Sequence, residues 1–186
     1  EFASATFDGA LRRYALIDES SGSKPEIAVG DLGGAPRRLT DLNPDLDVRQ
    51  LGQVTPMVVY NAAGTPVNAY LVHPPGFQTG TRYPMIVATY GFRGKFVLQG
   101  EWHSTFPAQV LASQGYLVLL LNRPMPLGQG IVGNPAKARD IEGPQMLSTV
   151  EAAIDGLVRE GIVDPDRIGL YGWSHGAFIV EFMLTH

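Results

Sequence analysis

The stretch "RIGLYGWSHGAFIVEFMLTH", residues 167–186, carries the most informative pattern in the chain. An apolar run from Ile168 to Tyr171 predicts a strand, and the run "AFIVEFML" that follows favours a helix. Between them, the pattern Gly-x-Ser-x-Gly places Ser174 in a turn bounded by Gly172 and Gly176. A nucleophile elbow requires a strand, a sharp turn and a helix in this order, so Ser174 is the candidate nucleophile.

The residue types in this turn fit nucleophilic chemistry. The serine must stand in a strained turn so that its Oγ projects clear of the sheet, and side chains at positions 172 and 176 would collide with adjacent backbone. The helix that follows points backbone N–H groups and its positive end at the reacting centre. We therefore expect the backbone N–H of His175 to be one oxyanion donor. The alternative interpretation is a glycine-bounded turn with an incidental serine.

A second oxyanion donor is expected from the loop after an earlier strand. The stretch "VATYGFRGKF", residues 87–96, is a buried strand that ends in a glycine turn. Tyr90 offers a phenolic hydroxyl, and a backbone N–H in the turn is an alternative donor. In the competing interpretation, Tyr90 lies at the core edge with its hydroxyl in water.

The first 50 residues read differently from the rest of the chain. Short strand-like runs, "RRYALIDE" and "EIAVGDL", separated by polar turns, predict antiparallel hairpins. From residue 51 onward strands alternate with helices, which predicts a parallel sheet covered on both faces. The strongest elements there are the buried strand "GYLVLLLN" and the amphipathic helix "MLSTVEAAIDGLVREGI". Asp140 and Glu142 are expected to mark the start of this helix as solvated side chains.

The hydrophobic content, net charge and cysteine count exclude several classes of function. The 186 residues are 45% hydrophobic and 17% charged, which predicts a folded chain. With a net charge of −4 and no basic cluster, we expect no nucleic-acid partner and no membrane partner. The absence of cysteine excludes disulfides and thiolate chemistry but assigns no compartment.

No cofactor and no metal are expected. The stretch "GQGIVG", residues 128–133, runs into Asn134 and Pro135 instead of opening a helix, so it does not predict a dinucleotide site. The four histidines have no carboxylate at a spacing typical of metal ligands. His73 is interpreted as a strand-end residue, and His103 either packs locally or lines the substrate pocket.

Several stretches together resemble the prolyl oligopeptidase family of serine peptidases. "EIAVGDLGGAPRRLTDLNP" is similar to the last blade of the family's β-propeller, and "GTPVNAYLVHPPGF" with "YPMIVATYGF" to the entry into its α/β-hydrolase domain. "LASQGYLVLLLNRP" and "GLVREGIVDPDRIGLYGWSHGA" resemble its approach to the nucleophile. The resemblance implies the end of a β-propeller domain in residues 1–50 and the N-terminal portion of a peptidase domain, an α/β-hydrolase fold, in residues 51–186.

The resemblance also implies roles for individual residues. Ser174 becomes the nucleophile, the His175 N–H an oxyanion donor, and Tyr90 the counterpart of the family's oxyanion tyrosine. The family's usual Tyr-Gly-Gly or His-Gly-Gly-Pro run is replaced here by "TYGFRGKF", so Phe92 is the alternative occupant of the tyrosine's place, without a hydroxyl. The unusual turn and the Pro-rich loop "NRPMPLGQGIVGNP" leave open the branch of the family that opens the isopeptide bond of lasso peptides.

The groups that would activate the serine are missing from these residues. In α/β-hydrolases the acid and then the histidine follow the serine along the chain. After Ser174 only Glu181 and His186 remain, both in the helix that carries the serine away from the sheet. We therefore expect the triad acid and histidine outside residues 1–186, on another chain or on a part lost by nicking. The expected partners are a peptide substrate and the remaining C-terminal part of the hydrolase domain.

Two further functions remain open at this point. One is an esterase or lipase on the same fold, against which the β-rich first 50 residues argue, because simple esterases carry no propeller. The other is a non-catalytic binding protein with an incomplete triad. The resemblance favours a serine peptidase for short or constrained peptides, because the family's propeller restricts access to the active site.

Overall fold

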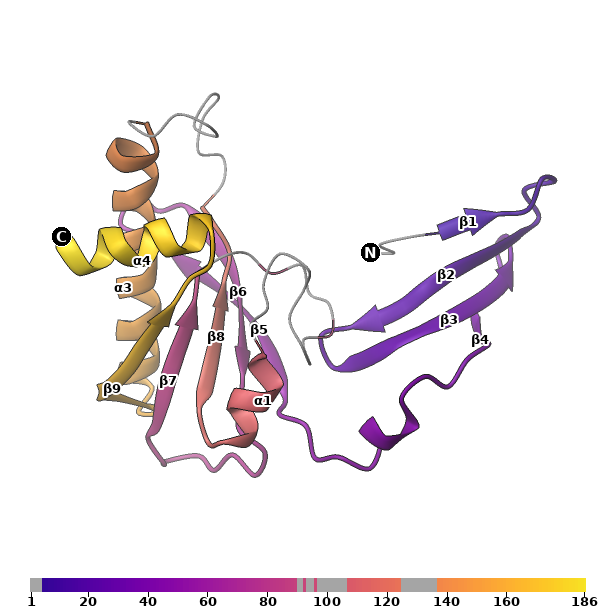
Figure 1. Cartoon of the computed structure of the whole chain (residues 1–186), viewed down its shortest axis with the longest axis horizontal. Coiled ribbons are helices and arrows are strands. Elements are labelled where there is room, and N and C mark those ends of the chain that lie inside the picture. The colour runs from indigo at the N-terminus through magenta and orange to yellow at the C-terminus, as the bar shows by residue number, and fades with distance from the viewer. Residues whose placement is uncertain (1–4, 90–91, 93–95, 97–106, 125–136) are drawn as a thin grey trace. The chain divides into compact units, whose positions relative to one another are not determined.

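The computed structural model describes residues 5–89, 92, 96, 107–124 and 137–186 (Figure 1). The described residues divide into two compact units. The first comprises residues up to Gln50 together with Phe96, and the second comprises the remainder from Leu51 onward. Each unit has its own sheet, and the candidate nucleophile belongs to the second.

The described part of the first unit is a four-stranded antiparallel sheet in the order β1-β2-β3-β4. Its strands are β1 (Ala5–Phe7), β2 (Arg13–Ser20), β3 (Ser23–Asp31) and β4 (Arg37–Arg38), followed by the 3-10 turn η1 (Pro44–Leu46). The antiparallel hairpins predicted from the sequence are present, and β2 and β3 form the longest pair. These strands are short and separated by polar turns, as expected of an all-β unit.

The described part of the second unit contains a five-stranded sheet in the order β5-β6-β8-β7-β9. The strands are β5 (Val54–Tyr60), β6 (Pro66–Val72), β7 (Tyr83–Ala88), β8 (Leu117–Leu121) and β9 (Val163–Tyr171). The helices are α1 (Ala108–Ser113), α3 (Gly143–Arg159) and α4 (His175–Thr185), and the π-helical turn η2 (Ala138–Glu142) precedes α3. This combination is an α/β fold.

The sheet is mixed, which corrects the prediction of a parallel sheet. β7 runs parallel to both β8 and β9, whereas β6 runs antiparallel to β5 and to β8. The hairpin between β5 and β6 is closed by Asn61, whose side chain accepts hydrogen bonds from the N–H groups of Ala63 and Thr65. A hairpin this short joins only antiparallel strands, so the parallel pattern begins at β7.

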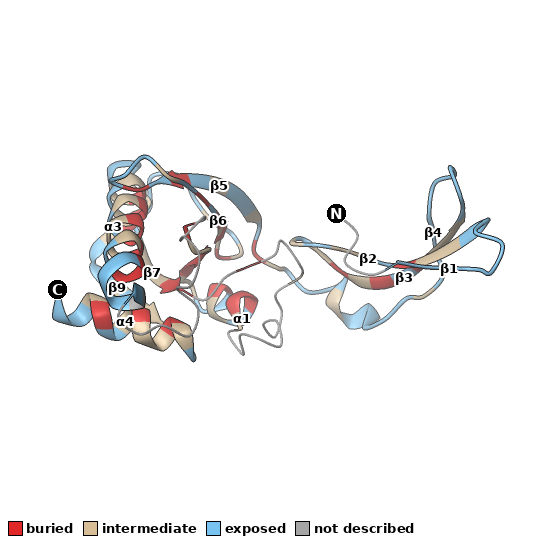
Figure 2. Cartoon of the chain, turned by 90° about the horizontal axis from the view of Figure 1, so that it is seen from above, coloured by how far each residue is buried: buried red, intermediate tan, exposed pale blue. Residues whose placement is uncertain are grey.

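Both faces of the sheet are covered, as the sequence predicts. In β8, Leu117, Leu119 and Leu121 belong to the core cluster that includes residues of α3 and α4. Val118 and Leu120 belong to a second cluster with residues of α1. Because neighbouring strand residues point to opposite faces, this division places α1 on one face and α3 with α4 on the other. Figure 2 shows the buried residues of α3 along the side that faces the sheet.

The long amphipathic helix begins earlier than its apolar period indicates. The apolar period favours a helix from residue 146, whereas α3 begins at Gly143 and the π-helical turn η2 extends the helical backbone to Ala138. Glu142 is the N-cap of α3, which confirms that it marks the helix start. Gly143 is needed at this point because a Cβ there would lie 2.7 Å from the ring of Phe182 in α4. Within the described part of the chain, no helix is long and apolar enough to cross a membrane.

Candidate active site

Ser174 stands at the sharp turn between β9 and α4, which confirms the strand, turn and helix predicted around it. Its backbone has φ 53° and ψ −118°, and its side chain makes no capping hydrogen bond to the helix. A non-glycine residue in such a region carries about 1–3 kcal/mol of strain, and residues of this kind cluster at functional sites. In the described part of the chain Ser174 is an exposed residue.

Close backbone packing holds this turn in place. A Cβ at Gly172 would lie 2.1 Å from the carbonyl oxygen of Gly176, so no larger residue fits at position 172. Thr89, which follows β7, donates its backbone N–H to the Tyr171 carbonyl at 3.1 Å and its hydroxyl to the Gly176 carbonyl at 3.3 Å. Hydrogen bonds from Thr89, the residue after β7, therefore hold the turn at both of its ends, Tyr171 and Gly176.

The turn lies where the parallel strands end (Figure 1). Ser174 follows β9, Thr89 follows β7, and Asn122 with Arg123 follows β8. In open α/β sheets, ligands bind outside the carboxyl ends of the strands, at the point where successive connections go to opposite faces. Here the connection through α1 and the connection through α3 cover opposite faces, which places Ser174 at such a point.

His175 is the first residue of α4. The N–H groups in the first turn of a helix have no partner within the helix, so the His175 N–H is available to a ligand beside Ser174. The turn is closed by hydrogen bonds from the Gly176 N–H to the Trp173 carbonyl at 2.8 Å and from the Ala177 N–H to the Ser174 carbonyl at 3.0 Å. This geometry is compatible with the predicted oxyanion donor.

Of the two candidates for the second oxyanion position, the structure describes one. Tyr90 lies outside the described residues. Phe92 is buried in the core cluster beside α1, and its ring meets that of Tyr70 edge-on at 4.5 Å. Its backbone N–H donates a hydrogen bond to the Asn122 side-chain oxygen. Phe92 thus has a packing role, and its ring is directed into the core.

A buried carboxylate lies beside the turn, and this corrects the expectation that Glu142 is solvated. The Glu142 side chain is 0% exposed, with Arg123 Nε at 2.6 Å and His175 Nε2 at 2.9 Å from Oε1. Asp140 is exposed, as expected. The sequence pattern does not show the burial of Glu142, because its two partners, Arg123 and His175, come from distant segments.

The other candidate residues do not gather around Ser174. His73 contacts Thr55 Oγ1 at 3.2 Å and the ring of Phe77 at 4.6 Å, so it is a packing residue at a strand end, as expected. His186 stacks on Phe182 at 4.0 Å, and Glu181 is exposed on α4. His103 and the stretch 128–133 lie outside the described residues. In the part of the chain that the structure describes, no cluster of three metal-ligating side chains is found.

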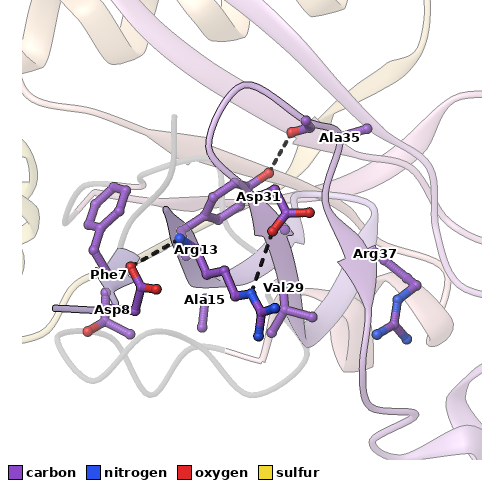
Figure 3. A pocket seen from close by; sticks show the side chains of 12 residues that line it. Phe7, Asp8, Arg13, Ala15, Val29, Asp31, Ala35 and Arg37 are labelled. Carbon is purple, nitrogen blue, oxygen red and sulfur yellow. Dashed lines mark hydrogen bonds and ion pairs between the residues drawn. The ribbon is translucent and has the colours of Figure 1, made fainter. Parts of the chain in front are cut away.

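The first unit carries a separate open hollow of about 670 Å³, lined entirely by its own residues (Figure 3). Arg13 and Asp31, paired on the adjacent strands β2 and β3, form an ion pair at 3.7 Å in its lining, and both side chains are largely exposed. Tyr14 donates its hydroxyl to the Gly34 carbonyl at 2.9 Å along one wall. An exposed ion pair of this kind contributes little to stability, so it is not by itself a binding feature.

Comparison with known proteins identifies relatives of the chain. Lasso peptide isopeptidase AtxE2 of Asticcacaulis excentricus is 35% identical over 155 residues, which are 80% of this chain and 22% of that protein. Dipeptidyl-peptidase 5 of Porphyromonas gingivalis is 33% identical over 117 residues, which are 63% of this chain and 17% of that protein. The chain belongs to the prolyl oligopeptidase family. It spans about a fifth of the length of these curated relatives.

Solved structures from this family have the same fold. The structure of apo AtxE2 isopeptidase aligns with 93% of this chain, and the aligned part is 27% of the AtxE2 chain. The TM-score is 0.77 and the sequence identity is 32%. A serine-to-alanine variant of AtxE2 with Astexin3-dC4 bound matches equally well, with a TM-score of 0.77. The acylaminoacyl peptidase of Pyrococcus horikoshii aligns with 100% of this chain, and the aligned part is 29% of the peptidase chain. The TM-score is 0.71 at 19% identity, a similarity that shows the fold alone. No family model matches the chain.

Proposed function

We propose that the chain is the nucleophile-bearing segment of a serine peptidase that cleaves amide bonds through an acyl-enzyme on Ser174. Residues 51–186 would be the N-terminal portion of an α/β-hydrolase domain, and residues 1–50 the end of a β-propeller. The observation that carries the proposal is the strained backbone of Ser174, φ 53° and ψ −118°, between a parallel strand and a helix N-terminus. Membership of a family of peptidases supports it.

The reaction proceeds in two halves. Ser174 Oγ attacks the carbonyl carbon of the peptide while its proton passes to a histidine base, and a tetrahedral oxyanion forms. The His175 N–H and Tyr90 hold that oxyanion, and the base then gives its proton to the departing amine. Water, deprotonated by the same base, releases the acyl group and regenerates the serine. The base and the acid that orients it come from the part of the protein outside residues 1–186.

The turn geometry supports this role for the serine. A strained turn costs folding free energy, and a protein keeps one where the surrounding structure imposes it. Here Gly172, Gly176 and Thr89 impose it through close backbone contact and hydrogen bonds. An incidental serine in a surface turn would need none of these constraints. The same argument weighs against a non-catalytic binding protein, although that function shares the fold.

A second candidate within the same chemistry is the isopeptidase reaction. The relative at 35% identity is named as a lasso peptide isopeptidase, and a solved structure of a variant of that protein has Astexin3-dC4 bound. In this reaction Ser174 would attack the carbonyl of an amide that joins a side chain to a backbone amine. The departing group is again an amine, so the proton transfers are the same and only the shape of the substrate differs.

A fluorophosphonate probe tests the nucleophile in the full-length protein that carries this chain. We expect stoichiometric labelling of the wild type and no labelling of Ser174→Ala. Equal labelling of both proteins, or labelling of neither, would overturn the assignment of Ser174. Gly169→Ala is a matched control on the same strand, because a Cβ there meets only Ile86 Cγ1, at 3.9 Å.

Substrate panels separate the remaining functions. A peptidase hydrolyses linear peptide amides, an isopeptidase opens a threaded peptide at its isopeptide bond, and an esterase turns over only ester substrates. We expect amide hydrolysis that disappears in Ser174→Ala. Turnover confined to esters would contradict the peptidase proposal and favour the esterase or lipase.

A further inference from the structure

Glu142 forms a buried junction between two segments that flank the candidate nucleophile. Its side chain is 0% exposed at the end of η2, and its Oε1 lies 2.6 Å from Arg123 Nε and 2.9 Å from His175 Nε2. Arg123 follows β8, and His175 is the residue after Ser174. One carboxylate oxygen therefore connects the carboxyl end of a central strand to the first turn of α4.

The burial of this carboxylate gives the junction its rigidity. A carboxylate removed from water is unfavourable unless it is paired, so the Arg123 guanidinium is required beside it. The Arg123 contact is a short charge-assisted hydrogen bond. The His175 contact is longer, at 2.9 Å, and its atoms are not aligned as a hydrogen bond, while Oε2 has no hydrogen-bond partner among the described residues. Breaking the Arg123 contact would leave an unpaired charge buried in the interior.

The His175 ring has a second contact in addition to Glu142. It packs against the ring of Phe178, one turn further along α4, with centroids 5.6 Å apart. A ring fixed on two sides limits rotation of the backbone to which it is attached. That backbone carries the N–H proposed as an oxyanion donor, and donors of this kind act only when they are held within hydrogen-bond distance of the developing charge.

We propose that Glu142, itself paired with Arg123, is a positioning residue that orients the oxyanion N–H of His175 by holding the His175 ring at its Oε1. This inference rests on the proposed function of Ser174. Glu142 does not touch the substrate in this role. Its effect passes through His175, and its loss would weaken stabilisation of the transition state more than binding of the ground state.

The test measures labelling by a fluorophosphonate in the full-length protein, with two readouts. The end point gives the fraction of folded active sites, and the rate gives the reactivity of each site. The variants are Glu142→Ala, Glu142→Gln and, as a control, Thr149→Val. Thr149 is equally buried on α3 and donates its hydroxyl to the Gln145 carbonyl at 2.6 Å, so its substitution perturbs the same helix without altering the Glu142 junction.

We expect Glu142→Ala to reach the wild-type end point at a rate lower by about 10-fold or more, because misplacing one oxyanion donor weakens transition-state stabilisation. Glu142→Gln keeps one acceptor oxygen, so its labelling rate should fall less than that of Glu142→Ala. For a peptide substrate, kcat should fall while KM changes little. Thr149→Val should keep the wild-type rate per site. A lower end point with an unchanged rate in Glu142→Ala would show a purely structural role and overturn the inference.

A double-mutant cycle with His175→Phe tests whether the effect passes through His175. Phenylalanine keeps a ring against Phe178 and removes the nitrogen that contacts Glu142. If Glu142 acts through that ring, the double variant should label no more slowly than the slower single variant, whereas independent effects would multiply. Multiplied effects would overturn the inference. Failure of wild-type labelling would instead overturn the function of Ser174, so the two outcomes are distinguishable.

Discussion

Ser174 holds a backbone conformation that its neighbours must enforce. Two other non-glycine residues of the described chain have positive φ, Leu11 and Asn43, and both lie in turns of the first unit. At Ser174 the enforcement comes from the contact between Gly172 and Gly176 and from the hydroxyl of Thr89. The strain therefore depends on three residues that themselves do no chemistry, and substitution at these positions should affect reactivity without removing the nucleophile.

Gly172→Ala is the sharpest single test of this dependence. The new Cβ would lie 2.1 Å from a backbone oxygen, which cannot move aside as a flexible side chain would. We expect the free energy of unfolding to fall by more than about 2 kcal/mol and labelling of Ser174 to be lost. Gly169→Ala, three residues earlier on β9, should leave both unchanged. Chemical denaturation and fluorophosphonate labelling measure the two effects, and a stable, reactive Gly172→Ala protein would contradict the turn geometry.

His73 gives a prediction about pH. Burial lowers its pKa from the usual 6.5, and its Nδ1 has no hydrogen-bond partner among the described residues. Because the unfolded chain binds the proton more readily than the folded one, stability should decline as pH falls below about 6.5. His73→Gln should flatten this decline. Denaturation midpoints at pH 7.5 and pH 5.5 measure the decline in stability. An equal decrease of the midpoint in wild type and variant would assign this decline to other groups.

At the scale of elements, sequence patterns predict what local periodicity controls. All five residues of β8 are buried, as a continuous apolar run predicts, and the apolar period of α3 correctly gives its buried face. The direction of strand pairing follows instead from the hairpin at Asn61 and from contacts between distant strands. The burial of Glu142 escapes the sequence pattern for the same reason, because its partner Arg123 lies 19 residues away and His175 lies beyond a further helix and strand.

The segment after β4 is attached to β3 through a second buried carboxylate, that of Glu26. Glu26 accepts hydrogen bonds from the Thr40 hydroxyl at 2.6 Å and from the Leu42 N–H at 2.9 Å, and it lies 3.6 Å from Lys24 Nζ. Lys24 in turn reaches Asp47 at 2.8 Å. The segment from Thr40 to Asp47 is thus held to β3 by polar contacts, in a unit with few buried apolar side chains.

We expect this attachment to depend on pH. The Thr40 hydrogen bond is the largest cause that lowers the pKa of Glu26 from its usual 4.5, so the ionised form is favoured in the folded state. Its contribution is present above pH 4.5 and is lost as pH falls through the lowered pKa. Glu26→Gln should lower the unfolding midpoint of the first unit at pH 7 and reduce its loss on acidification. Asp18→Asn, an exposed partner of Arg38, is the control and should do neither.

At the scale of the whole molecule, the proposed function places the attacking group, Ser174, in this chain and the acid and base that activate it outside residues 1–186. The sequence alone predicts the strand, turn and helix around Ser174, because the elbow is a local motif, and the roles proposed for Ser174 and the His175 N–H follow from that motif. In the proposed function the triad acid and base come from outside residues 1–186, so a local pattern within these residues has no means of showing them. Tyr90 stays a prediction, since it lies outside the described residues.

This division predicts different reactivity for the chain alone and for the full-length protein. Along α4, Glu181 lies about 10 Å from Ser174 and His186 about 18 Å, at 1.5 Å per residue, so neither reaches the serine hydroxyl. Without a base, Ser174 in residues 1–186 should react with a fluorophosphonate at least about 10⁴-fold more slowly than in the full-length protein. Circular dichroism would first establish that the isolated chain is folded. Equal rates in a folded chain would place the base within residues 1–186, and variants of His175 and His103 would then identify it.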